Sequence, residues 1–161
     1  MFKGLNELER AGWKMTHHIA AYTEAYHDQL VELWLRAVSQ THDFLTEEDI
    51  RFYYGMMQSG ALRSVEIWMC LNSKQEAIGF IGLDGSKIEM LFVDPLHHGQ
   101  GAGTKLIRHA ERLKGPGLQV DVNEQNPKAH AFYKKYGFVQ IGRSELDGSG
   151  KPFPLVHMQL R

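Results

Sequence analysis

The stretch LFVDPLHHGQGAGTKLI (91–107) joins an apolar run to an amphipathic segment through a turn with three glycines in five residues. The preceding run, KIEMLFV (87–93), alternates as a β-strand does. This pattern predicts two opposite faces: Ile88, Met90 and Phe92 on one, Glu89, Leu91 and Val93 on the other. Apolar residues at helical spacing follow the turn. A strand, a glycine turn and a helix start in this order expose backbone N–H groups that can bind an anion such as a diphosphate.

The segments on either side of this stretch predict a mixed α/β domain. Further strands are expected at 18–23, 65–71, 77–82, 118–122, 138–142 and 156–160. Helices are expected to begin at the caps Asp28 and Thr46, to follow the glycine turn as far as Gly115, and to span 126–137. The order βααβββαβαββ predicts a mostly antiparallel twisted sheet of about six to seven strands with helices on both faces.

Length and composition limit the class of protein. The chain has 161 residues, 43% of them apolar, and a formal charge of −1. These values predict a single domain, 15–161, in which no basic stripe or long apolar run indicates nucleic acid or a membrane as a partner. The lone Cys70 fits a reducing compartment such as the cytoplasm. Residues 1–14 are expected to be an appended leader segment, with a native N-terminal helix as the alternative.

Two common phosphate-binding patterns do not fit the glycine turn. A P-loop needs a glycine five residues before Gly103, where this chain has His98, and Thr104 separates that glycine from the lysine. The dinucleotide fingerprint begins correctly at Gly99 and Gly101 but requires a third glycine at position 104. The turn therefore belongs to a different phosphate-binding pattern or is an ordinary loop.

The same stretch resembles the acetyl-CoA diphosphate loop of the GNAT superfamily of N-acetyltransferases, with its pattern [QR]-x-x-G-x-[GA]. The segment NEQNPKAHAFYKKYGF (123–138) is similar to the family's N-x-x-A-x-x-F-Y-x-x-x-G-F segment. The likeness covers about 17–161. Three shorter segments resemble a small bacterial subgroup, the YjaB-like acetyltransferases: THDFL (41–45), VNEQN (122–126) and GRSELDGSGKPFPL (142–155). One departure is His98, where the family usually has Arg or Gln, because a histidine carries no permanent charge at neutral pH.

The resemblance implies a GNAT fold that transfers acetyl from acetyl-CoA to a primary amine by direct attack in a ternary complex. It implies that the loop, the end of the strand and two residues downstream bind the cofactor: Leu91, Phe92, Val93, His98, Gly99, Gln100, Gly101, Ala102, Gly103, Thr104, Asn126 and Tyr133. The amine acceptor is a peptide lysine or a small metabolite. A non-catalytic acyl-CoA sensor is the alternative from another class.

Two residues are candidates for proton transfer. An alkylammonium must lose a proton before it attacks, and Glu89 lies on the strand from which the family's bases often come. Substrate binding or simple exposure explains Glu89 equally well, since Lys87 occupies the commonest base position. Tyr133 matches the family's donor to the leaving thiolate. Full transfer from a phenol to a thiolate is uphill by roughly 2 kcal/mol, which favours a hydrogen bond; a purely structural Tyr133 is the alternative.

Other polar residues carry weaker signals. His42 and Phe44 resemble family positions that line the acceptor pocket, and ordinary loop positions explain them equally well. The chain has nine histidines but no metal-binding spacing, so no metal is expected. Cys70 alternates within a predicted strand and is expected to be a small core residue. The protein is expected to be a monomer or a homodimer.

Overall fold

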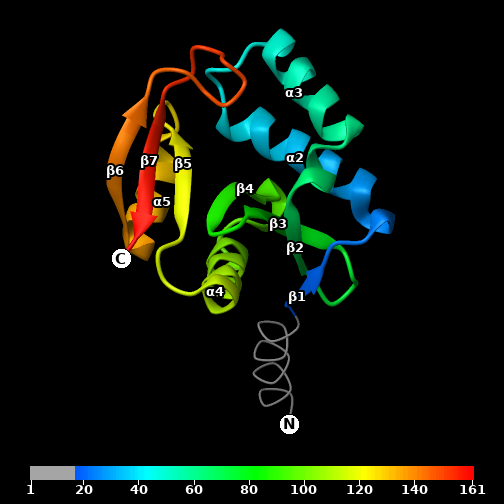
Figure 1. Cartoon of the computed structure of the whole chain (residues 1–161). Helices are drawn as coiled ribbons and strands as arrows, with labels where there is room; N and C mark the ends of the chain where they lie inside the picture. Colours follow the sequence, from blue (N-terminus) through cyan, green and yellow to red (C-terminus); the bar gives the residue numbers. More distant parts are fainter. Residues whose placement is uncertain (1–16) are drawn as a thin grey trace.

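The computed structural model of the protein describes residues 17–161, so the expected leader 1–14 lies outside the described residues. One seven-stranded sheet runs through the molecule in the order β1-β2-β3-β4-β5-β7-β6 (Figure 1). The strands are β1 (His18–Ala21), β2 (Glu66–Leu71), β3 (Ala77–Asp84), β4 (Lys87–Val93), β5 (Gln119–Asn123), β6 (Phe138–Ser144) and β7 (Leu155–Leu160). All neighbouring pairs are antiparallel except β4 and β5, which are parallel.

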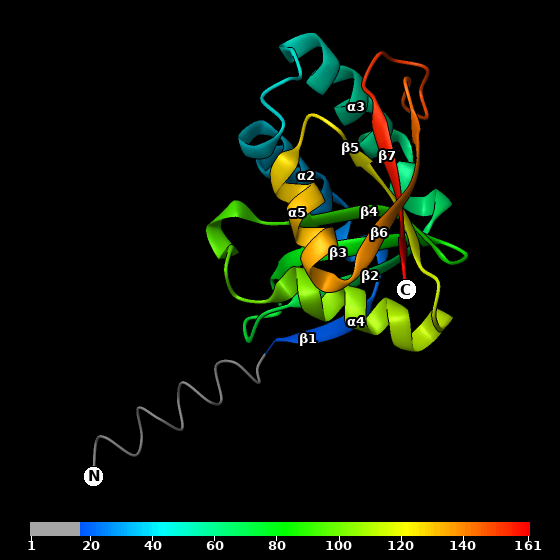
Figure 2. The same ribbon diagram turned by 90° about the vertical axis from the view of Figure 1, so that its left-hand side faces the viewer.

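Helices cover both faces of the sheet, as the sequence predicts. They are α2 (His27–Thr41), α3 (Glu47–Ser59), α4 (Ala102–Lys114) and α5 (Pro127–Tyr136), with short 3-10 turns η1 (Glu24–Tyr26), η2 (Ala61–Ser64) and η3 (Pro95–His97). One core joins α2 and α3 to β2 and β3, and a second joins α4 and α5 to the opposite face (Figures 1 and 2). The predicted mixed α/β class and strand number are confirmed.

Local capping signals place most helix ends correctly. Thr46 and Asp49 form the reciprocal capping box expected at the start of α3. Asn126 accepts a hydrogen bond from the Ala129 amide at the start of α5. The prediction that Asp28 caps the first helix is wrong: α2 begins at His27, with Tyr26 as its N-cap, and Asp28 lies within the first turn. The cause is η1, which leads directly into α2 without the extended residue that a side-chain cap needs.

Strand β4 departs from the alternation expected of it. Met90 and Phe92 pack on the α2 and α3 side, and Leu91 and Val93 on the α4 and α5 side, as predicted. Ile88, however, packs with the α4 and α5 core, so its predicted place beside Met90 and Phe92 is wrong. In the pairing with β3, Gly82 is opposite Met90 and the next residue, Leu83, is opposite Ile88, so Glu89 has no partner on β3. A bulge at Glu89 therefore inverts the faces on its two sides.

Strands β4 and β5 separate soon after they meet. They pair only at Lys87 with Gln119 and at Ile88 with Val120. The far end of β4 is anchored by Asp94, whose amide donates to the Ile78 carbonyl at 2.8 Å. The buried Asp94 carboxylate binds the Arg36 guanidinium of α2 at 2.7 Å and caps η3 by accepting from the Leu96 amide. This anchor fixes the point at which the glycine turn leaves the sheet.

We expect Asp94→Ala to lower the free energy of unfolding by about 1–3 kcal/mol at pH 7, because it removes a charged hydrogen bond and a cap. Burial alone would raise the pKa of Asp94, but Arg36 and the Leu96 amide lower it further than burial raises it. The ionised group therefore stabilises the fold at neutral pH, and this contribution is lost as the pH falls through the depressed pKa. Urea unfolding at neutral and acid pH measures it; Asp43→Ala, at an exposed position, is the control. Equal losses for the two variants at pH 7 would contradict the anchor.

Candidate active site

A cavity of about 570 Å³ opens where β4 and β5 separate. Its wall combines residues of α2, β4, the glycine turn, β5 and α5. Most of the residues predicted for the site line it: His42, Glu89, Leu91, Phe92, Val93, His98, Gly99, Gly101, Ala102, Gly103, Thr104, Asn126 and Tyr133. The fold thus brings the strand, the turn and the second sequence segment together around one space.

The glycines of the turn are required for two different reasons. Gly99 and Gly101 have φ of +77° and +81°, a left-handed conformation that other residues adopt only with strain. Gly103 lies inside α4, where an added Cβ would come within 3.2 Å of Cζ of Phe132 in α5. The first two glycines therefore shape the turn, and the third lets α4 approach α5 beside the cavity.

The start of α4 presents backbone donors at the cavity. Lys105 donates the first helical hydrogen bond, to the Gly101 carbonyl at 3.0 Å. The amides of residues 102–104 precede this bond and have no acceptor within the helix. The N-cap is Gly101, which has no side chain to satisfy them. The positive end of the helix dipole adds to these donors, so the turn can hold an anion.

Two predicted site residues lie apart from the cavity wall. The Oε1 atom of Gln100 is buried without a hydrogen-bond partner among the described residues. Phe44 packs instead on the ring of His42, with centroids 5.4 Å apart, and on Phe153 of the β6–β7 loop at 5.8 Å. The assignments of Gln100 to the cofactor and of Phe44 to the acceptor remain predictions.

Tyr133 and Glu89 lie in different environments within the cavity. Tyr133 is buried, and this burial raises the pKa of its phenol, so the hydroxyl keeps its proton at neutral pH. The Glu89 side chain is 37% exposed, with Oε1 3.9 Å from Nζ of Lys87. Lys87 also binds Asp121 of β5 at 2.8 Å, which raises the pKa of the lysine. The cavity therefore contains a neutral phenol and a carboxylate close to a cation.

Sequence reasoning missed several residues of the cavity wall. Asp121 and Asn123 follow Val120, the last residue of β5 that pairs with β4, and Lys128 lies in the first turn of α5. The only signal for the two β5 residues was their polarity on alternate positions of an apolar strand. Lys128 lies within the segment 123–138 that resembles the family, and a cation there could have been predicted to lie near the diphosphate.

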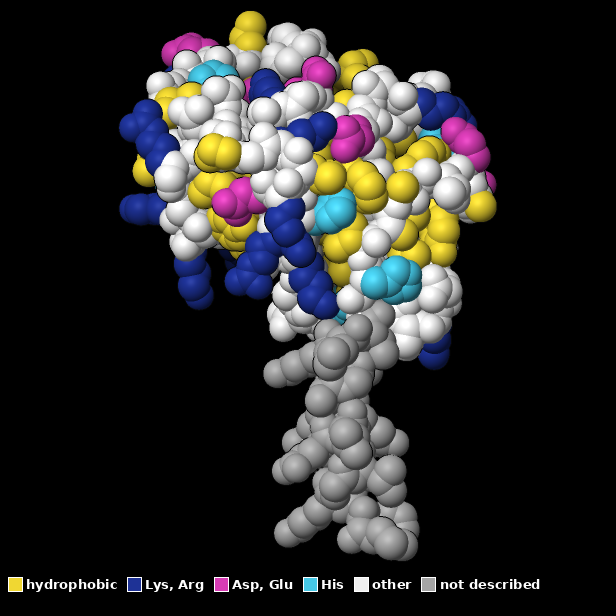
Figure 3. Space-filling model, turned by 60° about the horizontal axis from the view of Figure 1, so that its bottom comes forward, with side chains coloured by type: hydrophobic (Ala, Val, Ile, Leu, Met, Phe, Trp, Pro, Cys, Tyr) yellow, Lys and Arg dark blue, Asp and Glu magenta, His cyan; other side chains and the backbone are white. Residues whose placement is uncertain are grey.

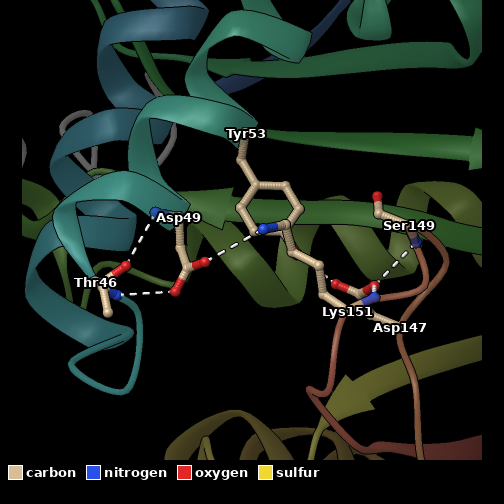
Figure 4. Close-up of polar contacts among 6 residues, drawn as sticks. All are labelled: Thr46, Asp49, Tyr53, Asp147, Ser149 and Lys151. Carbon is tan, nitrogen blue, oxygen red and sulfur yellow. Dashed lines mark hydrogen bonds and ion pairs between the residues drawn. The ribbon is translucent and has the colours of Figure 1, made fainter.

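The loop between β6 and β7 contacts α3 and reaches the His42 wall of the cavity through Phe153 and Phe44. His42 contacts Phe92 of β4, and burial lowers the pKa of His42, which keeps its ring neutral. In the loop, Lys151 lies 3.4 Å from Asp49 of α3 (Figure 4). The Tyr53 hydroxyl donates to Asp147. These contacts tie the loop to α3 across the two halves of the sheet.

A second cavity of about 680 Å³ adjoins the first through Thr104 and Phe132. Arg108, Lys135 and Arg161 contribute positive charge to its wall. Lys and Arg side chains gather on this end of the molecule, where α4 lies (Figure 3). Among residues 17–161, no group of three His, Cys, Asp or Glu side chains could hold a metal, and no helix could cross a membrane.

These features define an acetyltransferase of the GNAT type, and the chain belongs to that family. The family described as "Acetyltransferase (GNAT) domain" matches residues 22–161. The chain is 42% identical to peptidyl-lysine N-acetyltransferase YjaB of Salmonella typhimurium over 131 residues, which are 81% of this chain and 89% of that protein. It is 40% identical to YjaB of Escherichia coli over 81% and 88%. The solution structure of apo-form E. coli YjaB superposes with a TM-score of 0.83 and 37% identity, over 89% of this chain and 96% of that one. Like the family, the protein is an acetyl-CoA-dependent N-acetyltransferase that acts on an amine.

We expect Gly101→Asp to abolish CoA binding, since it adds a negative charge beside the amides that face the cavity. Any side chain at φ +81° strains the turn, so Gly101→Asn is the matched control: it has nearly the same shape, tolerates this conformation better than most residues, and adds no charge. Calorimetry with CoA should show a much larger loss for Asp than for Asn. Equal affinities in the two variants would refute the anion site.

His98→Arg tests the departure from the family pattern. His98 is exposed and lines the cavity, so a permanent cation there should hold or increase CoA affinity above pH 7. The measurement is calorimetry at pH 6 and pH 8, with His98→Gln as the uncharged control. A fall in the affinity of His98→Arg at pH 8 would show that the imidazole itself is required.

Proposed function

We propose that the protein acetylates the side chain of a peptide lysine, by direct attack of its amine on acetyl-CoA in a ternary complex. The cavity at the β4–β5 separation carries this proposal, because it joins an anion-binding turn to Glu89 and Tyr133. The names of the two YjaB relatives support a peptidyl-lysine acceptor. The lone Cys70 and the cytosolic supply of acetyl-CoA favour the cytoplasm as its location.

The cofactor is proposed to lie along the cavity from the turn to Tyr133. Its diphosphate binds the amides of residues 102–104, with His98 and Lys128 nearby on the wall. Its pantetheine arm, which contains amides, pairs with backbone groups of residues 91–93 and with Asn126. The nucleotide end then extends toward the second cavity, whose Arg108 and Lys135 suit a phosphate.

One proton transfer and one hydrogen bond accompany the reaction. The amine nitrogen forms a bond to the thioester carbon, and the C–S bond breaks with its electron pair on sulfur. Glu89 is proposed to take the amine's proton, directly or through water. Tyr133 donates a hydrogen bond to the thiolate. Because burial raises the pKa of Tyr133, complete transfer is costlier than for a phenol in water, so stabilisation by hydrogen bonding is favoured.

A small metabolite amine is the second candidate acceptor. The loop between β6 and β7 contacts α3 through Lys151 and Asp147, and its Phe153 packs on Phe44, which packs in turn on His42 of the cavity wall. A loop held beside this wall of the cavity suits a slender amine or a lysine in an extended segment better than a lysine on a rigid folded surface. A panel of peptides and free amines, followed by thiol release, separates the two.

Glu89→Gln and Tyr133→Phe should each lower kcat, by about 100-fold for the loss of a general base and about tenfold or more for the loss of the thiolate donor. Affinity for CoA should change little, because neither group is proposed to bind the diphosphate. Tyr54→Phe is the matched control, since the Tyr54 hydroxyl donates to Glu32 and the residue lines neither cavity.

The readouts are thiol release with a lysine peptide and calorimetry with CoA. Wild-type protein that binds acetyl-CoA but acetylates no amine in the panel would overturn the enzymatic proposal in favour of a sensor. Unchanged kcat in Glu89→Gln would remove Glu89 from the reaction and leave the rest of the proposal intact.

A further inference from the structure

Three polar side chains on neighbouring strands form a continuous hydrogen-bonded chain that begins at the edge of the cavity and leads away from it. Oγ of Ser144 in β6 lies 2.6 Å from Nε2 of His157 in β7. Nδ1 of the same imidazole lies 2.5 Å from Oδ1 of Asp121 in β5. Ser144 and His157 do not line the cavity, so the acetyl transfer proposed above does not use them.

The carboxylate fixes the direction of these hydrogen bonds. Burial would raise the pKa of Asp121, but the hydrogen bonds from Lys87 and His157 lower it more, so the group is ionised at neutral pH. An ionised carboxylate only accepts, hence Nδ1 of His157 donates to it. In the neutral imidazole Nε2 then carries the free lone pair. In that form Nε2 accepts a hydrogen bond from the Ser144 hydroxyl.

The backbone holds the imidazole in place. Gly142 is the Cα partner of His157 in the β6–β7 ladder, where the register shifts by one residue after Gln140. A Cβ at Gly142 would approach Cδ2 of His157 to 3.3 Å, closer than an ordinary contact. The ring therefore packs against a glycine at a bulge. Bulges change the direction in which nearby side chains leave a sheet. This packing keeps the imidazole between Asp121 and Ser144.

We propose that Ser144 is an activated nucleophile that takes an acyl group from an activated ester, with His157 as base and Asp121 as its orienting partner. A nucleophile in hydrogen-bond contact with a base, and a base oriented by a third group, is the arrangement that such chemistry requires. Ser144 is half-buried near the end of β6, an edge strand, between the exposed residues Arg143 and Glu145. A small ester can approach it from solvent.

The proposed step transfers the acyl group from the ester to the Ser144 oxygen. The Ser144 oxygen forms a bond to the acyl carbon as its proton moves to Nε2 of His157. The ester C–O bond then breaks, and the imidazolium returns the proton to the departing oxygen. Asp121 stabilises the imidazolium while it exists. The product is an O-acyl ester of Ser144 and a free alcohol or phenol.

Incubation of the full chain with p-nitrophenyl acetate, followed by peptide mapping, tests the proposal. We expect acetyl on Ser144 in a linkage that hydroxylamine cleaves, which distinguishes an ester from an acetylated lysine. The rate of acylation at Ser144 should fall about 100-fold or more in His157→Gln and should also fall in Asp121→Asn. Ser149→Ala is the control and should react at Ser144 as the wild type does, because Ser149 lies in the nearby loop apart from the imidazole.

Acetyl absent from Ser144 in the wild type would overturn the proposal, as would a wild-type rate in His157→Gln. Thermal unfolding checks that each variant is folded. If His157→Gln fails to fold, Gly142→Ala replaces it: the added methyl displaces the ring without removing it, and the rate should fall at least about tenfold. This assay uses neither acetyl-CoA nor an amine, so its result is independent of the function proposed above.

Discussion

The separation of β4 from β5 is the constraint on which the rest of the site depends. The two strands pair at only two positions, after which β4 stays with β3 and β5 stays with β7. Backbone groups that face the gap have no partner strand, and unpaired polar groups are costly when they are buried away from water. A long, flexible ligand with its own amides is well suited to satisfy them. The cavity is thus a consequence of the sheet's topology rather than of any single side chain.

The glycine turn acts at the end of this gap because several independent contacts fix its position. Asp94 joins β4 to β3 and α2, two left-handed glycines turn the chain, and Gly103 admits Phe132 beside the first turn of α4. Each feature is simple by itself. Together they direct the uncapped end of a helix at the cavity, where its dipole and its free amides act on the same ligand.

Local signals were sufficient to predict most of the fold. Alternation located the strands, and the capping box at Thr46, Asn126 before a proline, and Gly115 located helix ends, because each depends on neighbours in the sequence. The bulge at Glu89 was not predictable, since it arises from the register between two strands. The same holds for the chain of Asp121, His157 and Ser144, whose members meet only when β5, β7 and β6 are assembled. The family resemblance added the cofactor and the reaction, which periodicity alone did not indicate.

A crystal structure of the protein with CoA bound tests most directly whether the glycine turn holds the diphosphate at the end of the gap between β4 and β5. We expect diphosphate oxygens within about 3 Å of the amide nitrogens of residues 102–104, and the pantetheine arm between β4 and β5. A diphosphate bound elsewhere, or amides at 102–104 that are bonded to groups of the protein itself, would contradict it.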